Sequence, residues 1–212
     1  MSAETPRERP ILFNEQMVRA ILEGRKTVTR RVMKPQPDFL GSMVDPNTPF
    51  KTLDAGLHAR ITCPYGEPGD RLWVREAWAA DAQVDAIAPR DLSQGEPIWY
   101  PADFSVRQTG CSMISKGRGR PSIHMPRWAS RILLEITAVR VERLQDISEE
   151  QALAEGVRGE PCDHARQACS DIGCGGDTAK GAFGFLWEQL NGAGAWQANP
   201  WVWVVEFKRV TP

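Results

Sequence analysis

The longest regular pattern in the chain is an alternation of apolar and polar residues over 129–144. Its apolar positions are Ile132, Leu134, Ile136, Val139 and Val141. Side chains of a β-strand point alternately to its two faces, so the pattern predicts one long strand, or two consecutive strands, with a buried face. A β-sheet is therefore the first expectation for the fold.

Shorter patterns predict further strands and three helices. Strands are expected at 10–13, 27–33, 71–78, 98–104 and 201–210. Helices are expected at 15–23, capped by Asn14 and ended by Gly24, from a capping box of Ser148 and Gln151 up to Gly156, and at 179–190. In the last helix Phe183, Leu186, Trp187 and Leu190 are expected to face inward, and Trp187, Trp196, Trp201 and Trp203 to pack in the core.

This order of elements predicts an α+β fold in which a small β-barrel is decorated by helices. Apolar residues make up 42% of the chain, enough for a core, and the length of 212 residues fits a single domain over 1–212. Irregular loop insertions are expected near 35–67, 79–119 and 158–178 because these stretches are rich in turn residues or poorly patterned.

Charge is unevenly distributed although the net charge is −1. One basic stretch holds Arg19, Arg25, Lys26, Arg30, Arg31 and Lys34, and a second holds Arg107, Lys116, Arg118, Arg120, Arg127 and Arg131. Acids collect in 142–160 instead. Such segregation can build a positive face that binds phosphates, while the alternative is a solvated surface whose charges balance in three dimensions.

The first ten residues are polar and charged, and no apolar run approaches the ~18 residues of a membrane span. We therefore expect a cytoplasmic protein without a membrane partner. Five cysteines, an odd number, indicate thiols or a metal site and not a disulfide framework. Candidate metal ligands are Cys162, His164, Cys169 and Cys174, but their spacing is irregular for structural zinc, so we expect no metal and no other cofactor.

Four segments resemble the ASCH family. Residues 24–31, Gly-Arg-Lys-Thr-Val-Thr-Arg-Arg, follow the first expected helix as the ASCH signature does. Gly69-Asp70 before a strand, the strands and helix of 132–156, and the final strand at 201–208 are similar to its later landmarks. The similarity is closest to larger ASCH proteins of prophages, and it implies a PUA-like barrel with a role around RNA or modified nucleosides.

One branch of that family is an amidohydrolase of N4-acetylcytidine that uses a lysine, a threonine and a glutamate. The resemblance places these functions on Lys26, Thr29 and Glu155. Thr29 could then supply a nucleophilic hydroxyl, Lys26 could accept its proton and Glu155 could hold the substrate amine. In a regular strand residues 26 and 29 face opposite sides, so Lys26 must lie in the turn after Gly24. In the alternative, Lys26 contacts a phosphate, Thr29 is an ordinary strand residue and Glu155 is a solvated helix end.

Further candidate nucleoside-binding residues carry guanidinium, carboxylate, imidazole or indole groups, which can grip a phosphate, hydrogen-bond a base or stack on it. They are Arg25, Arg31, Glu76, Arg118, Arg120, His124, Arg127 and Trp128. For Arg31 and Glu76 an ion pair is the alternative, and for Trp128 a place in the core.

Three hypotheses follow. The first is the binding of RNA or a modified nucleoside in a basic cleft formed by 24–31, 122–128 and the helix end at Glu155. The second is hydrolysis of an acylated cytidine. The third is a phage-encoded protein that acts through partner contacts. The sequence leaves the oligomeric state open.

Overall fold

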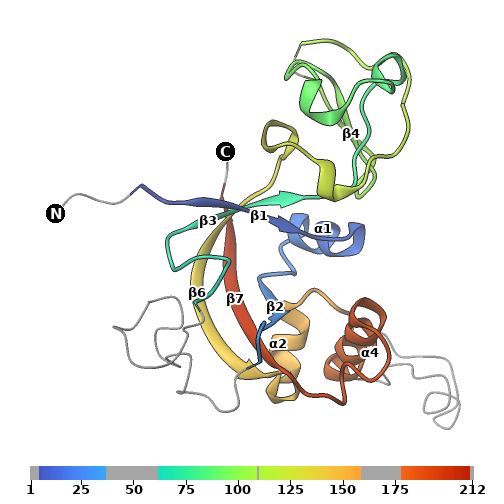
Figure 1. Ribbon diagram of the computed structural model, residues 1–212. Helices are drawn as coiled ribbons and strands as arrows, with labels where there is room; N and C mark the ends of the chain where they lie inside the picture. The colour runs from blue at the N-terminus through green and yellow to red at the C-terminus, as the bar shows by residue number, and fades with distance from the viewer. Residues whose placement is uncertain (1–4, 37–61, 109, 159–177, 211–212) are drawn as a thin grey trace, which may run out of the picture. The chain divides into compact units, whose positions relative to one another are not determined.

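The computed structural model of the protein describes residues 5–36, 62–108, 110–158 and 178–210 (Figure 1). It contains both helices and strands, which confirms the α+β class. The chain divides into two compact units. Unit 1 comprises 1–22, 70–135 and 209–212, and unit 2 comprises 23–69 and 136–208. Each is described by itself below.

Five strands are hydrogen-bonded in the order β1-β3-β6-β7-β2. Their bounds are Glu8–Leu12 for β1, Arg71–Arg75 for β3, Leu133–Arg143 for β6, Trp201–Val210 for β7 and Val28–Val32 for β2. β1 runs parallel to β3, whereas β3 with β6 and β2 with β7 are antiparallel, so the sheet is mixed. β6 passes from unit 1 into unit 2. Among the described residues the pairings form an open order, without closure into a barrel.

Unit 1 begins with β1 and helix α1 (Glu15–Leu22), whose start is capped because Met17 N donates to Asn14 Oδ1 at 2.8 Å. The expected loop 79–119 contains a two-stranded sheet of β4 (Ile98–Tyr100) and β5 (Ser105–Arg107). Single 3₁₀ turns lie at Ala82–Val84, Pro89–Asp91, Ser122–His124 and Arg127–Ala129. The buried residues of this part are Trp78, Ala80, Leu92, Ile98, Tyr100, Met125 and Ala129. β4 lies within the strand expected at 98–104, whereas β5, with three residues, is too short for a period-two pattern to be recognised.

Unit 2 packs two helices against strand residues of β2 and β7. α2 (Glu149–Ala154) carries the expected capping box of Ser148 and Gln151, and α4 (Ala179–Asn191) is capped by Thr178. A 3₁₀ turn at Leu144–Asp146 precedes α2. The core consists of Val28, Leu144, Ile147, Ala152, Ala179, Phe183, Trp187, Val202 and Val204. The helices thus hold the segments before β2 and after α2 in a fixed geometry.

Two expectations about the C-terminal core are wrong in part. Leu190 falls in the last turn of α4 and is 52% exposed, because the buried contacts of the helix end near Trp187. Trp187 and Trp203 are buried, whereas Trp196 and Trp201 are half-buried. Trp196 still packs against the core, since its ring lies against Gly184 of α4.

Within the described ranges the structure has no helix that combines the length and the apolar character needed to cross a bilayer.

Candidate functional site

Lys26 is a buried ammonium group in unit 2. It lies between Gly24, whose φ of +76° turns the chain out of helix α1, and the start of β2. Its side chain is 0% exposed. Lys26 Nζ donates to Val28 O at 2.8 Å, to Glu155 O at 2.9 Å and to Glu155 Oε2 at 2.7 Å. Lys26 follows the turn at Glu23 and Gly24 and pairs as an isolated bridge with Glu155, so this segment carries Lys26 to Glu155 and not to Thr29.

Glu155 occupies the C-cap of α2, and Gly156 follows it with φ +89°. Its backbone pairs with Lys26 as an isolated bridge, and its carboxylate is 3% exposed. Oε1 accepts from Arg30 Nη1 at 3.3 Å while Oε2 accepts from Lys26. The carboxylate thus joins two buried cations, which fits the general finding that buried charges are compensated.

The three acceptors around Lys26 match the three protons of an ammonium group, whereas a neutral amine has only two to donate. Burial lowers the pKa of Lys26 below 10.5, and the charges of Arg31 and Arg30 act in the same direction. The Glu155 carboxylate opposes this and favours the charged form. The site therefore holds a cation that can lose its proton at lower cost than an exposed lysine.

Thr29 does not join the face that carries this cluster. Residues of a strand alternate, so Val28 and Arg30 share one face of β2, while Thr29 and Arg31 share the other. Thr29 is 2% exposed and pairs in register with Val205. Burial raises the pKa of Tyr65, and the nearby charge of Arg31 opposes this rise, while the same charge adds to the lowering of the Lys26 pKa that burial causes. The structure brings Lys26 and Glu155 together and leaves Thr29 with Arg31.

From Arg30 a hydrogen-bond network leads away from the buried cluster. Arg30 Nη2 donates to Glu142 Oε2 at 3.1 Å and to Gln151 Oε1 at 2.9 Å. Arg140 in turn donates to both Glu142 and Glu206. The last of these contacts crosses from β6 to β7. The network therefore connects the buried Lys26 with more exposed side chains of unit 2.

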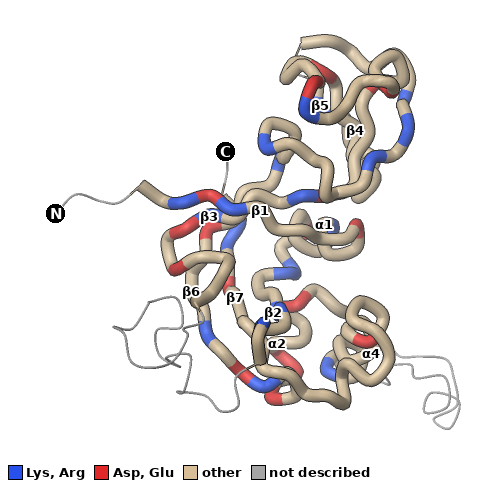
Figure 2. Tube along the Cα trace, in the orientation of Figure 1, with Lys and Arg blue, Asp and Glu red and all other residues tan. Residues whose placement is uncertain are grey.

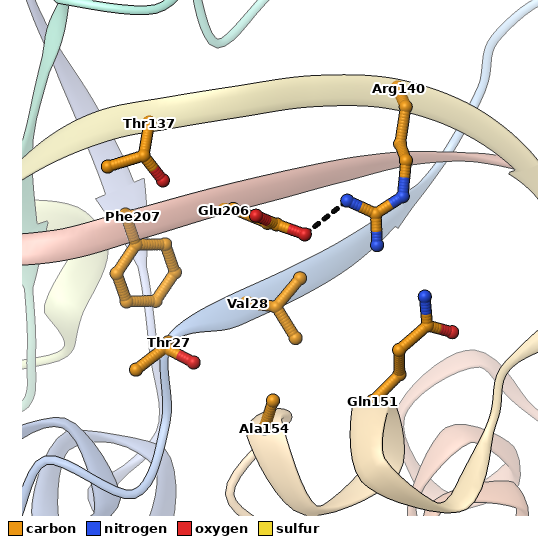
Figure 3. Close-up of a pocket in the computed structure, with 8 residues that line it drawn as sticks. All are labelled: Thr27, Val28, Thr137, Arg140, Gln151, Ala154, Glu206 and Phe207. Atoms are coloured by element: carbon orange, nitrogen blue, oxygen red, sulfur yellow. Dashed lines mark hydrogen bonds and ion pairs between the residues drawn. The ribbon is translucent and has the colours of Figure 1, made fainter.

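A pocket of about 230 Å³ lies at the outer end of this network (Figure 3). Its lining residues are Thr27, Val28, Thr137, Arg140, Gln151, Ala154, Glu206 and Phe207. Strands β2, β6 and β7 form one wall and α2 supplies Gln151 and Ala154 on the other (Figure 3). Apolar wall residues thus lie beside hydroxyl, amide, guanidinium and carboxylate groups.

The network has no excess positive charge. Its cations are Lys26, Arg30 and Arg140, and its anions are Glu155, Glu142 and Glu206. Basic and acidic residues adjoin along β6 in Figure 2. Within the basic stretch 24–34, Lys26 and Arg30 are neutralised in space by Glu155 at the end of α2 and by Glu142 of β6. This arrangement is typical of a site for a neutral, polar ligand.

Arg25 makes its contacts next to the Lys26–Glu155 pair. Its Nη1 donates to Gly156 O at 2.8 Å and its guanidinium pairs with Glu23. It therefore holds the turn before β2 to the end of α2 and supports the position of Lys26.

Two of the expected binding residues, Glu76 and Arg120, make their contacts inside unit 1. Glu76 is 1% exposed and accepts two bonds of 2.9 Å from Arg131, which also binds Asp103 at 2.8 Å. Burial raises the pKa of Glu76, and Arg131 opposes that rise. Arg120 is buried and donates to Ile87 O and Val84 O, so its guanidinium satisfies backbone carbonyls. These two side chains stabilise the unit.

The remaining expected residues lie at the surface of unit 1. Arg118 and His124 are exposed, and Arg127 pairs with Glu8 at 2.9 Å. Trp128 is half-buried, and the Arg107 guanidinium carbon lies 5.8 Å from its ring centre. The expected cleft combined 122–128, which belongs to unit 1, with 24–31 and Glu155, which belong to unit 2.

The candidate metal ligands Cys162, His164, Cys169 and Cys174 lie outside the described residues. Within the described part, no group of three or more His, Cys, Asp or Glu side chains could hold a metal ion.

Sequence reasoning missed the pocket residues Thr27, Thr137, Arg140, Gln151 and Glu206. A signal was present for Glu206, which is the one acid in the otherwise apolar run 201–207. Such a charge in a buried strand calls for a partner, and Arg140 provides it.

No family model, no curated protein and no solved structure matches the chain.

Proposed function

We propose that the protein binds RNA or a modified nucleoside, and that the pocket between β2, β6, β7 and α2 holds one nucleoside. The PUA-like barrel of the ASCH family, expected from the motif at 24–31, is part of this proposal. The observation that carries it is the neutral network of three cations and three carboxylates that ends at the pocket.

Charge balance supports a base or nucleoside over a phosphate. A phosphate needs uncompensated cations or several convergent backbone N–H groups. Each cation of the network already binds a carboxylate, so an added anion would meet Glu142 and Glu206 as well as the arginines. A neutral base avoids that repulsion.

Size and chemistry support the same class of ligand. The pocket, at about 230 Å³, is smaller than the ~300–1,000 Å³ of sites for drug-sized molecules. Val28, Ala154 and Phe207 offer apolar surface to the faces of a base, whereas Gln151, Arg140 and Glu206 can donate to and accept from its edge. A pyrimidine has both kinds of group on its edge.

The proposal is tested with a variant in which a large side chain on α2 fills the pocket. Ala154→Trp places an indole in the pocket, and Leu153→Trp on the same helix is the matched control, because Leu153 is 50% exposed and does not line the pocket. Calorimetric titration with cytidine, N4-acetylcytidine, uridine and cytidine monophosphate should give binding to wild type and to Leu153→Trp, and none to Ala154→Trp. The monophosphate should bind no better than its nucleoside. Equal nucleoside binding by both tryptophan variants would contradict the proposal.

Hydrolysis of an acylated cytidine is the second candidate, and one observation favours it. Lys26 and Glu155, two of the three residues that the amidohydrolase resemblance selects, lie 2.7 Å apart. Arg31, which shares its strand face with Thr29, acts on Lys26 through its charge. The resemblance would have Thr29 attack the acyl carbon while Lys26 takes up the hydroxyl proton and passes it to the departing cytidine amine; water would then hydrolyse the acyl-threonine to acetate and restore Thr29. This route needs Thr29 to meet Lys26, whereas Thr29 faces the side of β2 opposite the Lys26–Glu155 cluster. Release of acetate from N4-acetylcytidine is the measurement.

A further inference from the structure

Phe104 is an exposed aromatic residue held in a strained conformation. It ends the turn between β4 and β5, with φ at 60° and 74% of its surface exposed. A bulky side chain in the left-handed region is uncommon and strained, since only glycine, asparagine and aspartate visit it readily. Because the ring is exposed, its burial contributes little stability to offset this backbone strain. Neither conformation nor packing explains a phenylalanine here.

The turn holds this ring in a fixed place. Tyr100 and Ser105 pair across the strands, and Asp103 Oδ1 accepts from Ser105 N at 3.2 Å and from Ser105 Oγ at 2.8 Å. Asp103 is itself bound by Arg131 at 2.8 Å. Because the backbone on both sides is fixed, a ligand would not have to order the turn that carries the ring.

A second aromatic ring and a cation lie beside Phe104. Trp99 and Phe104 have ring centres 6.1 Å apart and planes inclined at 48°. Ile98 and Tyr100 point into the core, so Trp99 and Val106, which pair with each other, lie on the outer face of the two strands. Lys116 Nζ lies 3.8 Å from the centre of the Trp99 ring. The outer face therefore combines two rings with an ammonium group.

Two cations of the segment beside these rings lack a carboxylate partner among the described residues. Among the described residues, neither Lys116 nor the exposed Arg118 forms an ion pair through its side chain. The nearby Asp81 carboxylate accepts three backbone N–H bonds, and Asp85 accepts from Arg118 N. Basic residues follow one another along this segment in Figure 2. Two cations thus remain for a partner.

We propose that the outer face of β4 and β5 binds single-stranded nucleic acid, with one base stacked on Phe104 and the neighbouring phosphates bound by Lys116 and Arg118. Exposed rings combined with cations are what unpaired strands require, because every base has an aromatic face and every linkage a negative charge. The site belongs to unit 1 and does not depend on the nucleoside pocket of unit 2. An apolar protein partner would not use the two cations.

The test is fluorescence polarisation with labelled dodecauridylate and the full-length protein. Phe104→Asn removes the ring but tolerates the backbone conformation, and Phe104→Trp keeps an aromatic ring. The matched control is Phe185→Ala in α4, where the phenylalanine is 41% exposed. Phe104→Asn should weaken binding about 5- to 100-fold, the range for loss of one stacked base. Phe104→Trp and Phe185→Ala should bind as wild type does, and Phe104→Asn should melt no lower than wild type.

Lys116→Gln with Arg118→Gln should reduce the slope of log affinity against log salt by about 1.4, since each phosphate contact with a single strand contributes ~0.7. Unchanged binding by Phe104→Asn would overturn the proposal. So would a wild type that binds no dodecauridylate at about 50 mM salt, or one that prefers duplex RNA. Nucleoside binding by the Phe104 variants should stay intact, so failure here is distinct from failure of the pocket.

Discussion

Lys26 Nζ lies 2.7 Å from Glu155 Oε2, although 129 positions separate the two residues in the chain. Both side chains are buried, at 0% and 3% exposure. The ammonium group also donates to Val28 O and Glu155 O. The pair joins the turn before β2 to the end of α2, and its energetics decide both the stability of unit 2 and any chemistry of Lys26.

Removing one partner of the Lys26–Glu155 pair should strongly destabilise the fold. Lys26→Met leaves the Glu155 carboxylate buried with Arg30 alone, and we expect a loss of about 3–5 kcal/mol in the free energy of unfolding. Lys26→Met with Glu155→Leu removes both charges and should lose less than the sum of the single changes. Urea unfolding of the four proteins gives the coupling energy, with the exposed Lys34→Met as control. Strict additivity would show that the two groups do not interact.

The Glu76–Arg131 pair predicts a pH-dependent stability in unit 1. Burial raises the pKa of Glu76 above 4.5, and Arg131 opposes it, so Arg131→Met should raise the pKa further. A raised pKa gives stability at low pH that is lost as pH rises through it. The deficit of Arg131→Met against wild type should therefore grow from about pH 4.5 upward. Urea midpoints across this range measure it, and Arg90→Met, at an 87% exposed side chain, is the control. A deficit that does not change with pH would count against a buried, unpaired Glu76.

Asp81 predicts the opposite pH dependence. Its carboxylate accepts from the backbone N–H groups of Gln83, Ile114 and Ser115, and these bonds lower its pKa below 3.8. A lowered pKa gives stability above the ordinary value that is lost as pH falls through the lowered one. Wild type should therefore exceed Asp81→Asn in stability at neutral pH, and the difference should shrink in acid. Melting temperatures measure this, with the exposed Asp91→Asn as control. A difference that persists unchanged in acid would mean that the charge of Asp81 is not the cause.

For the hydrolase candidate, turnover of N4-acetylcytidine should rise with pH as Lys26 loses its proton. Because burial lowers the pKa of Lys26, this rise should lie below pH 10.5. Thr29→Val should abolish acetate release with little change in nucleoside affinity, and so should Lys26→Arg, since a guanidinium cannot accept the proton. Leu153→Ala, at a half-exposed residue outside the pocket lining, is the control. Turnover that survives Thr29→Val would exclude that hydroxyl as nucleophile.

Charges counted along the chain do not reveal which of them are paired in space. Lys26 and Arg30 are close in sequence, and their partners Glu142 and Glu155 come from β6 and from the end of α2. Counting charges within a stretch of 24–34 could not include acids that arrive only when α2, β6 and β7 pack around β2. The sequence also could not indicate Phe104, because its strain depends on a turn between two three-residue strands.

What the sequence by itself determined is local. The Asn14 cap, the capping box of Ser148 and Gln151, the glycines at the ends of the first two helices and the alternation along β6 all depend on residues within about four positions or on a period of two. Tertiary structure alone decided that Lys26 meets Glu155, that Thr29 faces the other side of β2, and that Arg140 closes a neutral network at a pocket. These contacts depend on how strands pair and helices pack, where burial forces each charge to find a partner that may be more than a hundred residues away.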